Sequence, residues 1–149
     1  MQLTPMMERF ILHFGEMGSR WGFNRTVGQM YGLIVISDTP LSANDIADAL
    51  GISRGNVSMG IKELESWRLL AVKHIPGDRK EYYAAAGSIL EMARRVMEER
   101  KRREFDPTLT LLRDTLLETP ANPGEAHAQL KMREIHDLLE VAARLARVG

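Results

Sequence analysis

The first 36 positions carry apolar residues three or four apart, which is the spacing of amphipathic helices. Thr4 followed by Pro5 is typical of a helix N-cap and first helical position, and the apolar pattern then continues to Trp21. Gly22 predicts the end of this helix. We therefore expect a first helix that buries one face.

A second helix is predicted to begin at Asn24, a residue type that caps helix N-termini, and to end near Ile36. Its wide apolar face indicates burial. Gly28 and Gly32 lie one turn apart in it, although each glycine costs a helix about 1 kcal/mol relative to alanine. We therefore expect another segment to approach this glycine pair closely.

Two short helices joined by a glycine turn are predicted next. Ser42 and Asp45 have the spacing of a capping box, Gly51 suits a left-handed C-cap, and Ser53 can cap the following helix. This order predicts a helix-turn-helix, although an ordinary helical hairpin would show the same single features. The positions expected to point inward are Ile46, Ala47, Leu50, Ile52, Val57, Ile61 and Leu64.

A β-hairpin is predicted directly after the helix pair. Residues 70–75 have a strand pattern, Pro76-Gly77 suits the centre of a type II turn, and residues 82–84 form a return strand. The basic pair Arg79-Lys80 falls near the tip, which is the arrangement of a wing; the alternative is a solvated charged turn. The expected fold is mainly α: a winged helix-turn-helix with a two-stranded β wing and long terminal helices forming a dimer interface.

The remaining residues show helical periodicity. A long helix from Ser88 is expected to be interrupted at Pro107, with Asp106 capping the next helix, and residues 119–124 are a helix breaker before a last, leucine-rich helix. Three regions are therefore expected: an N-terminal helix for dimerisation or core packing (1–23), a winged helix-turn-helix DNA-binding region (24–87) and a C-terminal helical dimerisation region (88–149).

Composition restricts the class of protein. The 149 residues include 20 basic residues, 20 acidic residues and no cysteine, which excludes disulfide scaffolds, thiolate zinc sites and thiol redox sensors. The four histidines lack metal-ligand spacing, and no phosphate-binding loop or nucleophile elbow is present, so we expect no enzyme, metal or cofactor. No apolar run could span a membrane and nothing marks export, so a cytoplasmic protein without a membrane partner is expected.

The charge is unevenly distributed along the chain. Residues 51–103 carry 12 basic and seven acidic residues, whereas both flanking regions carry more acid than base. The pI of about 6.9 is low for a nucleic-acid binder, so two copies on adjacent half-sites are expected to share the binding. The densest basic run, residues 100–103, is interpreted as a solvated helix face with local ion pairs; a second nucleic-acid surface or a targeting signal is the alternative.

The second helix of a helix-turn-helix enters the major groove of DNA. If Val57 and Ile61 point inward, Met59 and its polar neighbours point outward. Arg54 could form a bidentate pair with guanine, and Asn56 could reach adenine or a phosphate; each polar side chain could instead be merely solvated. The residues predicted to contact DNA are Ser53, Arg54, Gly55, Asn56, Ser58 and Lys62 on this helix, Arg79 and Lys80 on the wing, and, more weakly, Arg25.

These segments together resemble one known family. The motifs that carry the resemblance are Phe14-Gly15-Glu16, Gly28-Gln29-Met30-Tyr31-Gly32, Ser37-Asp38-Thr39-Pro40-Leu41-Ser42, the run from Leu50 to Ser58, and the run from Pro76 to Tyr83. Over roughly residues 10–85 the sequence resembles the GbsR branch of the MarR-type regulators. The resemblance implies a dimeric winged-helix transcription factor, usually a repressor, with Arg54, Asn56, Ser58, Arg79 and Lys80 contacting DNA. Where MarR-type wings often carry a second arginine this chain has Lys80, which lacks the guanidinium fork, so Arg79 is expected to read the minor groove.

The resemblance also implies a small-molecule effector, with choline-like compounds proposed for some members of the branch. A quaternary ammonium ion would need an aromatic cage. Phe14, Trp21 and Tyr31 could supply the rings and Glu16 a counter-charge, although aromatic residues at helical spacing are more often core.

The sequence therefore predicts a dimeric, sequence-specific DNA-binding regulator, with the recognition helix in the major groove and the wing at the minor groove. Two alternatives stay open: a winged helix used for protein–protein contact, and a helical adaptor that assembles through its C-terminal leucines without binding DNA. The polar recognition face favours DNA, while Met59 leaves room for a protein partner.

Overall fold

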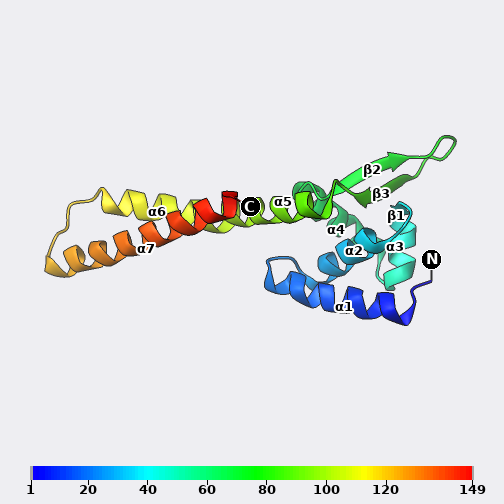
Figure 1. Cartoon of the computed structure of the whole chain (residues 1–149), viewed down its shortest axis with the longest axis horizontal. Coiled ribbons are helices and arrows are strands. Elements are labelled where there is room, and N and C mark those ends of the chain that lie inside the picture. Colours follow the sequence, from blue (N-terminus) through cyan, green and yellow to red (C-terminus); the bar gives the residue numbers. More distant parts are fainter. Residues whose placement is uncertain (1, 149) are drawn as a thin grey trace. The chain divides into compact units, whose positions relative to one another are not determined.

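The computed structural model describes residues 2–148, with side chains up to residue 145. The chain forms two compact units, residues 1–92 and residues 93–149, and each is described by itself. Unit 1 contains the helix-turn-helix and the wing, and unit 2 is helical (Figure 1).

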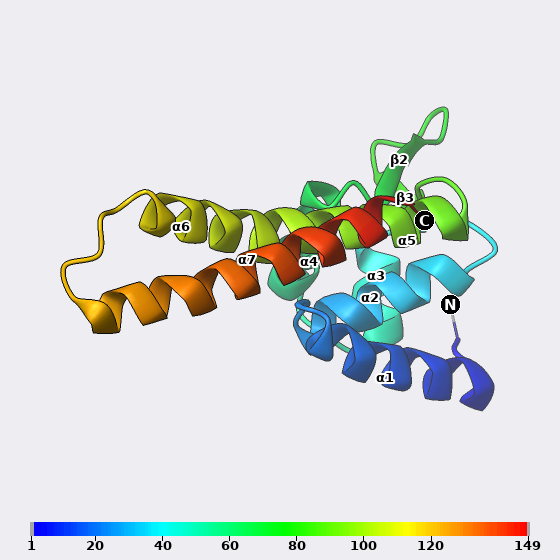
Figure 2. The same cartoon turned by 60° about the vertical axis from the view of Figure 1, so that its left-hand side comes forward.

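Unit 1 begins with two helices that pack side by side, α1 (Pro5–Arg20) and α2 (Arg25–Ile36) (Figure 2). Thr4 Oγ1 accepts a hydrogen bond from the backbone N–H of Met7, and Asn24 Oδ1 accepts one from Val27, so both predicted caps are confirmed. The close approach expected at Gly28 is also present. A β-carbon there would lie 3.1 Å from the Cα of Gly15 on α1.

The helix-turn-helix consists of α3 (Ala43–Leu50) and α4 (Arg54–Ser66). Ser42 Oγ accepts the Asp45 N–H at 3.2 Å, and Asp45 Oδ2 accepts the Ser42 N–H at 2.9 Å, which is the predicted capping box. Gly51 ends α3 at φ +65°, a conformation that favours glycine, and turns the chain toward α4.

The wing belongs to a three-stranded antiparallel sheet. The strands β2 (Leu70–His74) and β3 (Glu81–Ala85) form the predicted hairpin, which extends away from the helices in Figure 1. A third strand, β1 (Leu41–Ser42), pairs with the other edge of β3, giving the order β1-β3-β2. This two-residue strand was not predicted, because it is too short to show an alternating pattern. It ties the start of α3 to the base of the wing.

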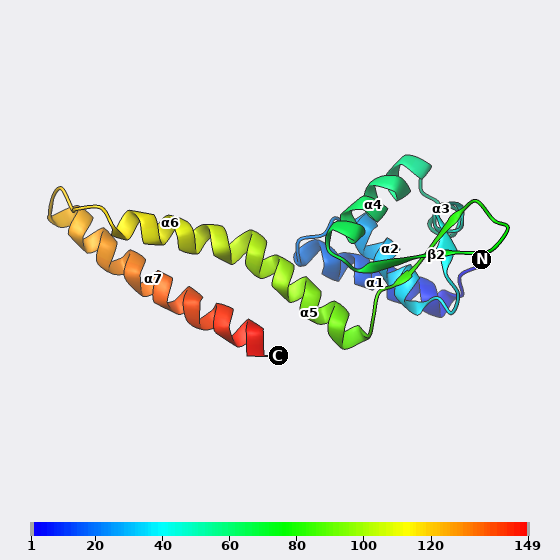
Figure 3. The ribbon, with the colours of Figure 1, turned by 90° about the horizontal axis from the view of Figure 1, so that it is seen from above.

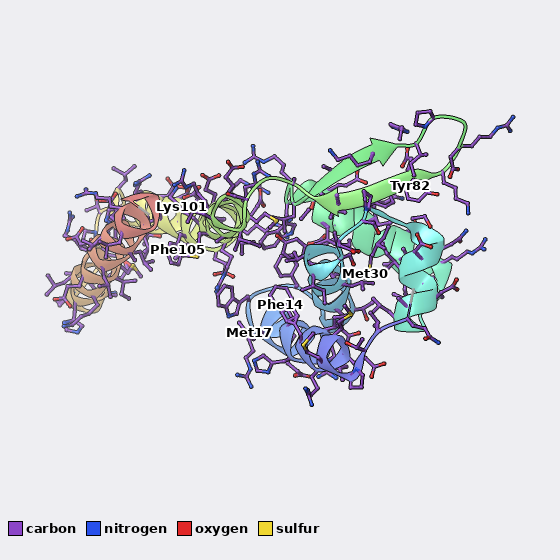
Figure 4. The ribbon with its side chains drawn as sticks, turned by 45° about the vertical axis from the view of Figure 1, so that its right-hand side comes forward. Phe14, Met17, Met30, Tyr82, Lys101 and Phe105 are labelled. Atoms are coloured by element: carbon purple, nitrogen blue, oxygen red, sulfur yellow. The ribbon has the colours of Figure 1, made fainter. Side chains whose placement is uncertain are left out.

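The core of unit 1 lies between α2, the helix-turn-helix and the sheet. Met30, near the middle of α2, is fully buried and lies in the interior in Figure 4. The Tyr31 hydroxyl donates a hydrogen bond to Met92 Sδ at 2.7 Å, which ties α2 to the end of the unit. The other fully buried large side chains are Leu33, Ile46, Val57, Leu64 and Leu69, with Trp67 almost fully buried.

Unit 2 is reached through α5 (Ile89–Arg100) and consists of η1 (Lys101–Phe105), α6 (Asp106–Leu116) and α7 (Pro123–Val148), which returns alongside α6 (Figure 3). The predicted break at Pro107, with Asp106 as a cap, is wrong. Asp106 has helical dihedral angles, and its N–H bonds to the Lys101 carbonyl oxygen five residues back. This wider π-helical turn precedes the proline, which lacks an N–H, and the helical path continues through it.

Candidate nucleic-acid interface

The recognition helix α4 has distinct buried and exposed faces. Val57, Ile61 and Leu64 are buried, and Gly60 packs against α2. In Figure 3, α4 lies at the edge of unit 1, with α2 on its inner side. The predicted outward residues Arg54, Gly55, Asn56, Ser58, Met59 and Lys62 are all exposed. The inward and outward assignment made from the sequence is therefore confirmed.

The N-terminal turn of α4 presents hydrogen-bond donors to solvent. Ser53 Oγ accepts the Asn56 N–H at 3.1 Å, whereas the N–H groups of Arg54 and Gly55 have no partner within the described residues. A β-carbon at Gly55 would find only Ser53 Oγ within 4 Å, at 3.9 Å. A phosphate could therefore approach this turn closely and bind its free N–H groups, which helix N-termini favour.

The polar side chains of this face are not used inside the protein. In the part of the chain that the structure describes, Arg54, Lys62 and the Asn56 amide make no side-chain hydrogen bond or ion pair, and neither does Ser58. The first turn of α4 carries no acidic residue. The carboxylates of this helix, Glu63 and Glu65, lie in its C-terminal half.

The wing tip is held by Asp78. Its N–H bonds to the Ile75 carbonyl oxygen across a turn in which Gly77 has φ +83°. Asp78 Oδ1 accepts the Lys80 N–H at 2.9 Å, and Oδ2 accepts the hydroxyl of Tyr82, labelled on β3 in Figure 4, at 2.6 Å. The bond from Tyr82 is the main reason why the pKa of Asp78 lies below its ordinary value.

This arrangement corrects one expectation and adds one residue. We expected Asp78 to orient a neighbouring arginine; instead it fixes the backbone of the tip, and Arg79 is exposed without an ion-pair partner among the described residues. Lys80 is also exposed. Tyr82 was not identified as a support of the wing, although its spacing of four from Asp78 across a hairpin tip was a usable signal.

Arg25 and Glu16 lie together, away from their separately predicted roles. Arg25 Nη2 lies 3.0 Å from Glu16 Oε1, which forms an ion pair between α2 and α1 at the surface. Glu16 is therefore already neutralised as a counter-charge for a ligand, and Arg25 would have to leave this partner to bind a phosphate.

The aromatic residues proposed for an effector site are partly core. Phe14 packs on Gly32, and its ring centroid lies 6.0 Å from that of Tyr31 and 5.3 Å from that of Phe10. Tyr31 is buried, whereas Trp21 follows the last residue of α1 and is half-exposed. Phe14 and Tyr31 are thus in contact with each other, while Trp21 lies a full helical segment further along α1.

The basic run at residues 100–103 forms the local ion pairs expected of a solvated helix face. Arg102 and Arg103 both pair with Glu99, at 2.9 and 3.1 Å, and Lys101 pairs with Asp106 at 3.2 Å. The hydrogen bond from Arg102 is the main cause that lowers the pKa of Glu99. These cations are held by neighbouring carboxylates, unlike those of α4.

Two other kinds of site were sought among residues 2–148. No cluster of His, Asp and Glu side chains in this range could hold a metal ion. Within the same residues, no helix combines the length and apolar character that crossing a membrane requires.

Comparison with known proteins identifies the family. The fold, the exposed polar face of α4 and the wing define a winged helix-turn-helix DNA-binding protein. Residues 21–81, which span most of the helix-turn-helix and wing, match the MarR family model. The chain is a DNA-binding transcriptional regulator of the MarR family. No curated protein sequence is significantly similar to it.

Solved structures share the fold at low sequence identity. One described as a transcriptional regulator is 20% identical, covers 96% of this chain and 94% of its own, and has a TM-score of 0.72. A transcriptional regulator from Thermotoga maritima is 16% identical over 92% of this chain and 91% of its own, with a TM-score of 0.46. The Staphylococcus aureus MepR–DNA complex is 18% identical over 91% of this chain and 93% of its own, with a TM-score of 0.43.

Proposed function

We propose that this regulator binds a specific duplex site as a homodimer in the cytoplasm and represses transcription, with α4 in the major groove and the β2–β3 hairpin at the minor groove. The observation that carries the proposal is the exposed N-terminal half of α4, whose polar side chains have no use inside the described protein. Groups left unpaired on a convex helix face are available to the edges of bases.

Arg54 is assigned the direct reading of a guanine, because its guanidinium is exposed and unpaired at the helix start. Asn56 is assigned an adenine or a phosphate. Ser53, Ser58 and the open turn at Gly55 are assigned phosphate oxygens, and Lys62 a phosphate one to two turns further along.

On the wing, Arg79 is assigned the minor groove. A narrow A·T-rich minor groove concentrates negative potential and attracts arginine. Lys80 is assigned a flanking phosphate, which needs only a point charge. Arg25 remains a weaker phosphate candidate, since it would have to exchange Glu16 for DNA.

The dimer interface is assigned to an apolar stripe on α7. Leu130, Leu138, Val141 and Leu145 fall on one side of the helix and are exposed by 52–70%. The opposite side contains Ala143, which is buried toward α6. Apolar side chains at this spacing, left uncovered in one chain, suit a second copy, and two copies would double the cationic groups available to DNA.

We also propose that the chain belongs to the GbsR branch and responds to a small cation such as a quaternary ammonium compound. The motifs from Phe14 to Gly32 support the branch. An effector near Phe14, Trp21 and Tyr31 would have to separate rings that now contact each other, or bind beside Trp21. Titration of choline into the protein–DNA complex tests this point: dissociation supports it, and no effect up to millimolar concentration removes it.

The DNA proposal is tested with a duplex selected from a random pool by the wild-type protein. The affinity should fall steeply with salt, by a slope of about 0.9 in log units for each phosphate contact. Arg54→Ala should weaken the selected duplex by about 1–3 kcal/mol and random DNA much less. Arg9→Ala, an exposed arginine on α1, is the matched control. Equal losses on both duplexes would reassign Arg54 to a phosphate, and salt-independent binding would refute the interface.

The dimer proposal is tested with Leu138→Asp, measured by sedimentation. The carboxylate should dissociate the dimer and weaken operator binding together, whereas Leu117→Asp, exposed at the end of α6, should do neither. A dimeric Leu138→Asp variant would exclude the α7 stripe. Repression is tested by in vitro transcription from the DNA beside the protein's own gene, where added protein should reduce the transcript.

A further inference from the structure

The recognition helix carries one exposed apolar side chain at the centre of its polar face. Met59 is 71% exposed, the largest exposed fraction among the hydrophobic residues of unit 1 for which such exposure is recorded. At 100° per residue it lies about 160° around the helix from the buried Val57. It therefore points as directly away from the core as any residue of α4.

The surroundings of Met59 are those of a DNA-reading surface. Ser58 precedes it, Lys62 follows three residues later on the same side, and Gly55 one turn earlier leaves open space. A protein-binding methionine would be expected among further exposed apolar residues, and no other large hydrophobic residue of α4 is exposed. The charge of this face, with unpaired Arg54 and Lys62, is complementary to DNA.

One feature of the major groove is apolar. Thymine presents a C5-methyl group there, and no other base of unmodified DNA does so. A flexible thioether side chain can pack on that methyl and exclude water from it. Met59 lies about 7.5 Å along the helix axis from Arg54, at 1.5 Å per residue, so the two side chains reach different base pairs.

We propose that Met59 is a specificity-determining residue that packs against a thymine methyl in each half-site, beyond the base pair read by Arg54. The inference rests on the proposed function, because it assumes that α4 enters the major groove. It adds an apolar contact to an interface otherwise built from charges and hydrogen bonds. It also predicts that the operator holds an A·T pair at one fixed offset from the guanine.

Deoxyuridine tests the inference, because it differs from thymidine only by the missing methyl group. Each thymine of the selected half-site is replaced in turn, and the dissociation constant is measured for wild type and for Met59→Ala. Wild type should lose about three- to fivefold at one position, the fold-change for about 0.8 kcal/mol per buried methyl-sized group. Met59→Ala should bind the thymine and uracil duplexes equally at that position.

Two variants complete the experiment. Met59→Leu, still apolar, should keep part of the preference for thymine, and Met6→Ala, at an exposed methionine of α1, should keep all of it. Circular dichroism of each variant checks that the helices are intact. Methyl discrimination that survives in Met59→Ala, or its absence at every position in wild type, would overturn the assignment of Met59. Failure of wild type to select any duplex would instead overturn the proposed function.

Discussion

The substitution Val57→Ala tests the orientation of the recognition helix, on which the DNA assignments depend. Val57 is fully buried in α4. The change removes two methyl groups, each worth about 0.8 kcal/mol of burial, and leaves a small cavity that the surrounding helices fill only partly. We expect unfolding to become easier by about 2–3 kcal/mol, a fall in Tm of roughly 5–10 °C for a chain of this size.

The matched control is Met59→Ala, two residues further along the same helix but 71% exposed. Its free energy of unfolding should stay within about 0.5 kcal/mol of wild type, since truncation of an exposed side chain leaves no cavity. Both variants are measured by urea unfolding and thermal melts at one fixed protomer concentration, because dimerisation would make Tm concentration-dependent. A loss at Met59 equal to or larger than that at Val57 would show that α4 is rotated from the orientation described, and would refute the reasoning.

Three further predictions concern packing and pH. Gly28→Ala should destabilise by about 1–3 kcal/mol in urea unfolding, because the new methyl group meets the Gly15 backbone at 3.1 and 3.3 Å, whereas Gly55→Ala, which faces open space, should stabilise the helix by up to about 1 kcal/mol. Burial and the Glu81 carboxylate raise the pKa of Tyr83 from 10.0 to about 12; its contribution to stability should therefore be complete below pH 10 and disappear as the pH approaches 12, and absorbance at about 295 nm with circular dichroism would follow both events. The hydrogen bond from Tyr82 lowers the pKa of Asp78 below 3.8, so the wing tip should keep its order above that pH and lose it as the pH falls through the lowered pKa; a Lys80 amide shift that titrates at or above 3.8 would contradict this.

Local rules were enough to predict the elements that place the DNA-reading face. Ser42, Ser53 and Asn24 each cap a helix through a side-chain oxygen that accepts an N–H two or three residues inside the helix. Gly51 and Gly77 have the positive φ that their turns require. These effects act within about four residues, so the sequence pattern contains all of the information that they need.

Features that depend on distant partners could not be predicted in the same way. β1 exists because Leu41 and Ser42 meet Tyr83 and Tyr82, about 40 residues away, and two residues show no period. The Arg25–Glu16 ion pair likewise requires the packing of α1 on α2. At Pro107, the sequence indicates a lost hydrogen bond but not whether the chain breaks or widens by one residue, because both outcomes accommodate a missing N–H.

The absence of net charge does not conflict with DNA binding, because the placement of carboxylates decides the local potential. Many of them are engaged away from the recognition face: Glu16 with Arg25, Glu99 with Arg102, and Glu140 with Arg113. Glu63 and Glu65 of α4 lie about 13–16 Å along the axis from Arg54, beyond the screening length of about 8 Å at physiological salt. A phosphate at the start of α4 therefore meets Arg54 and the free N–H groups with little opposition from these carboxylates, and the balanced total of the chain is no guide to the field at that point.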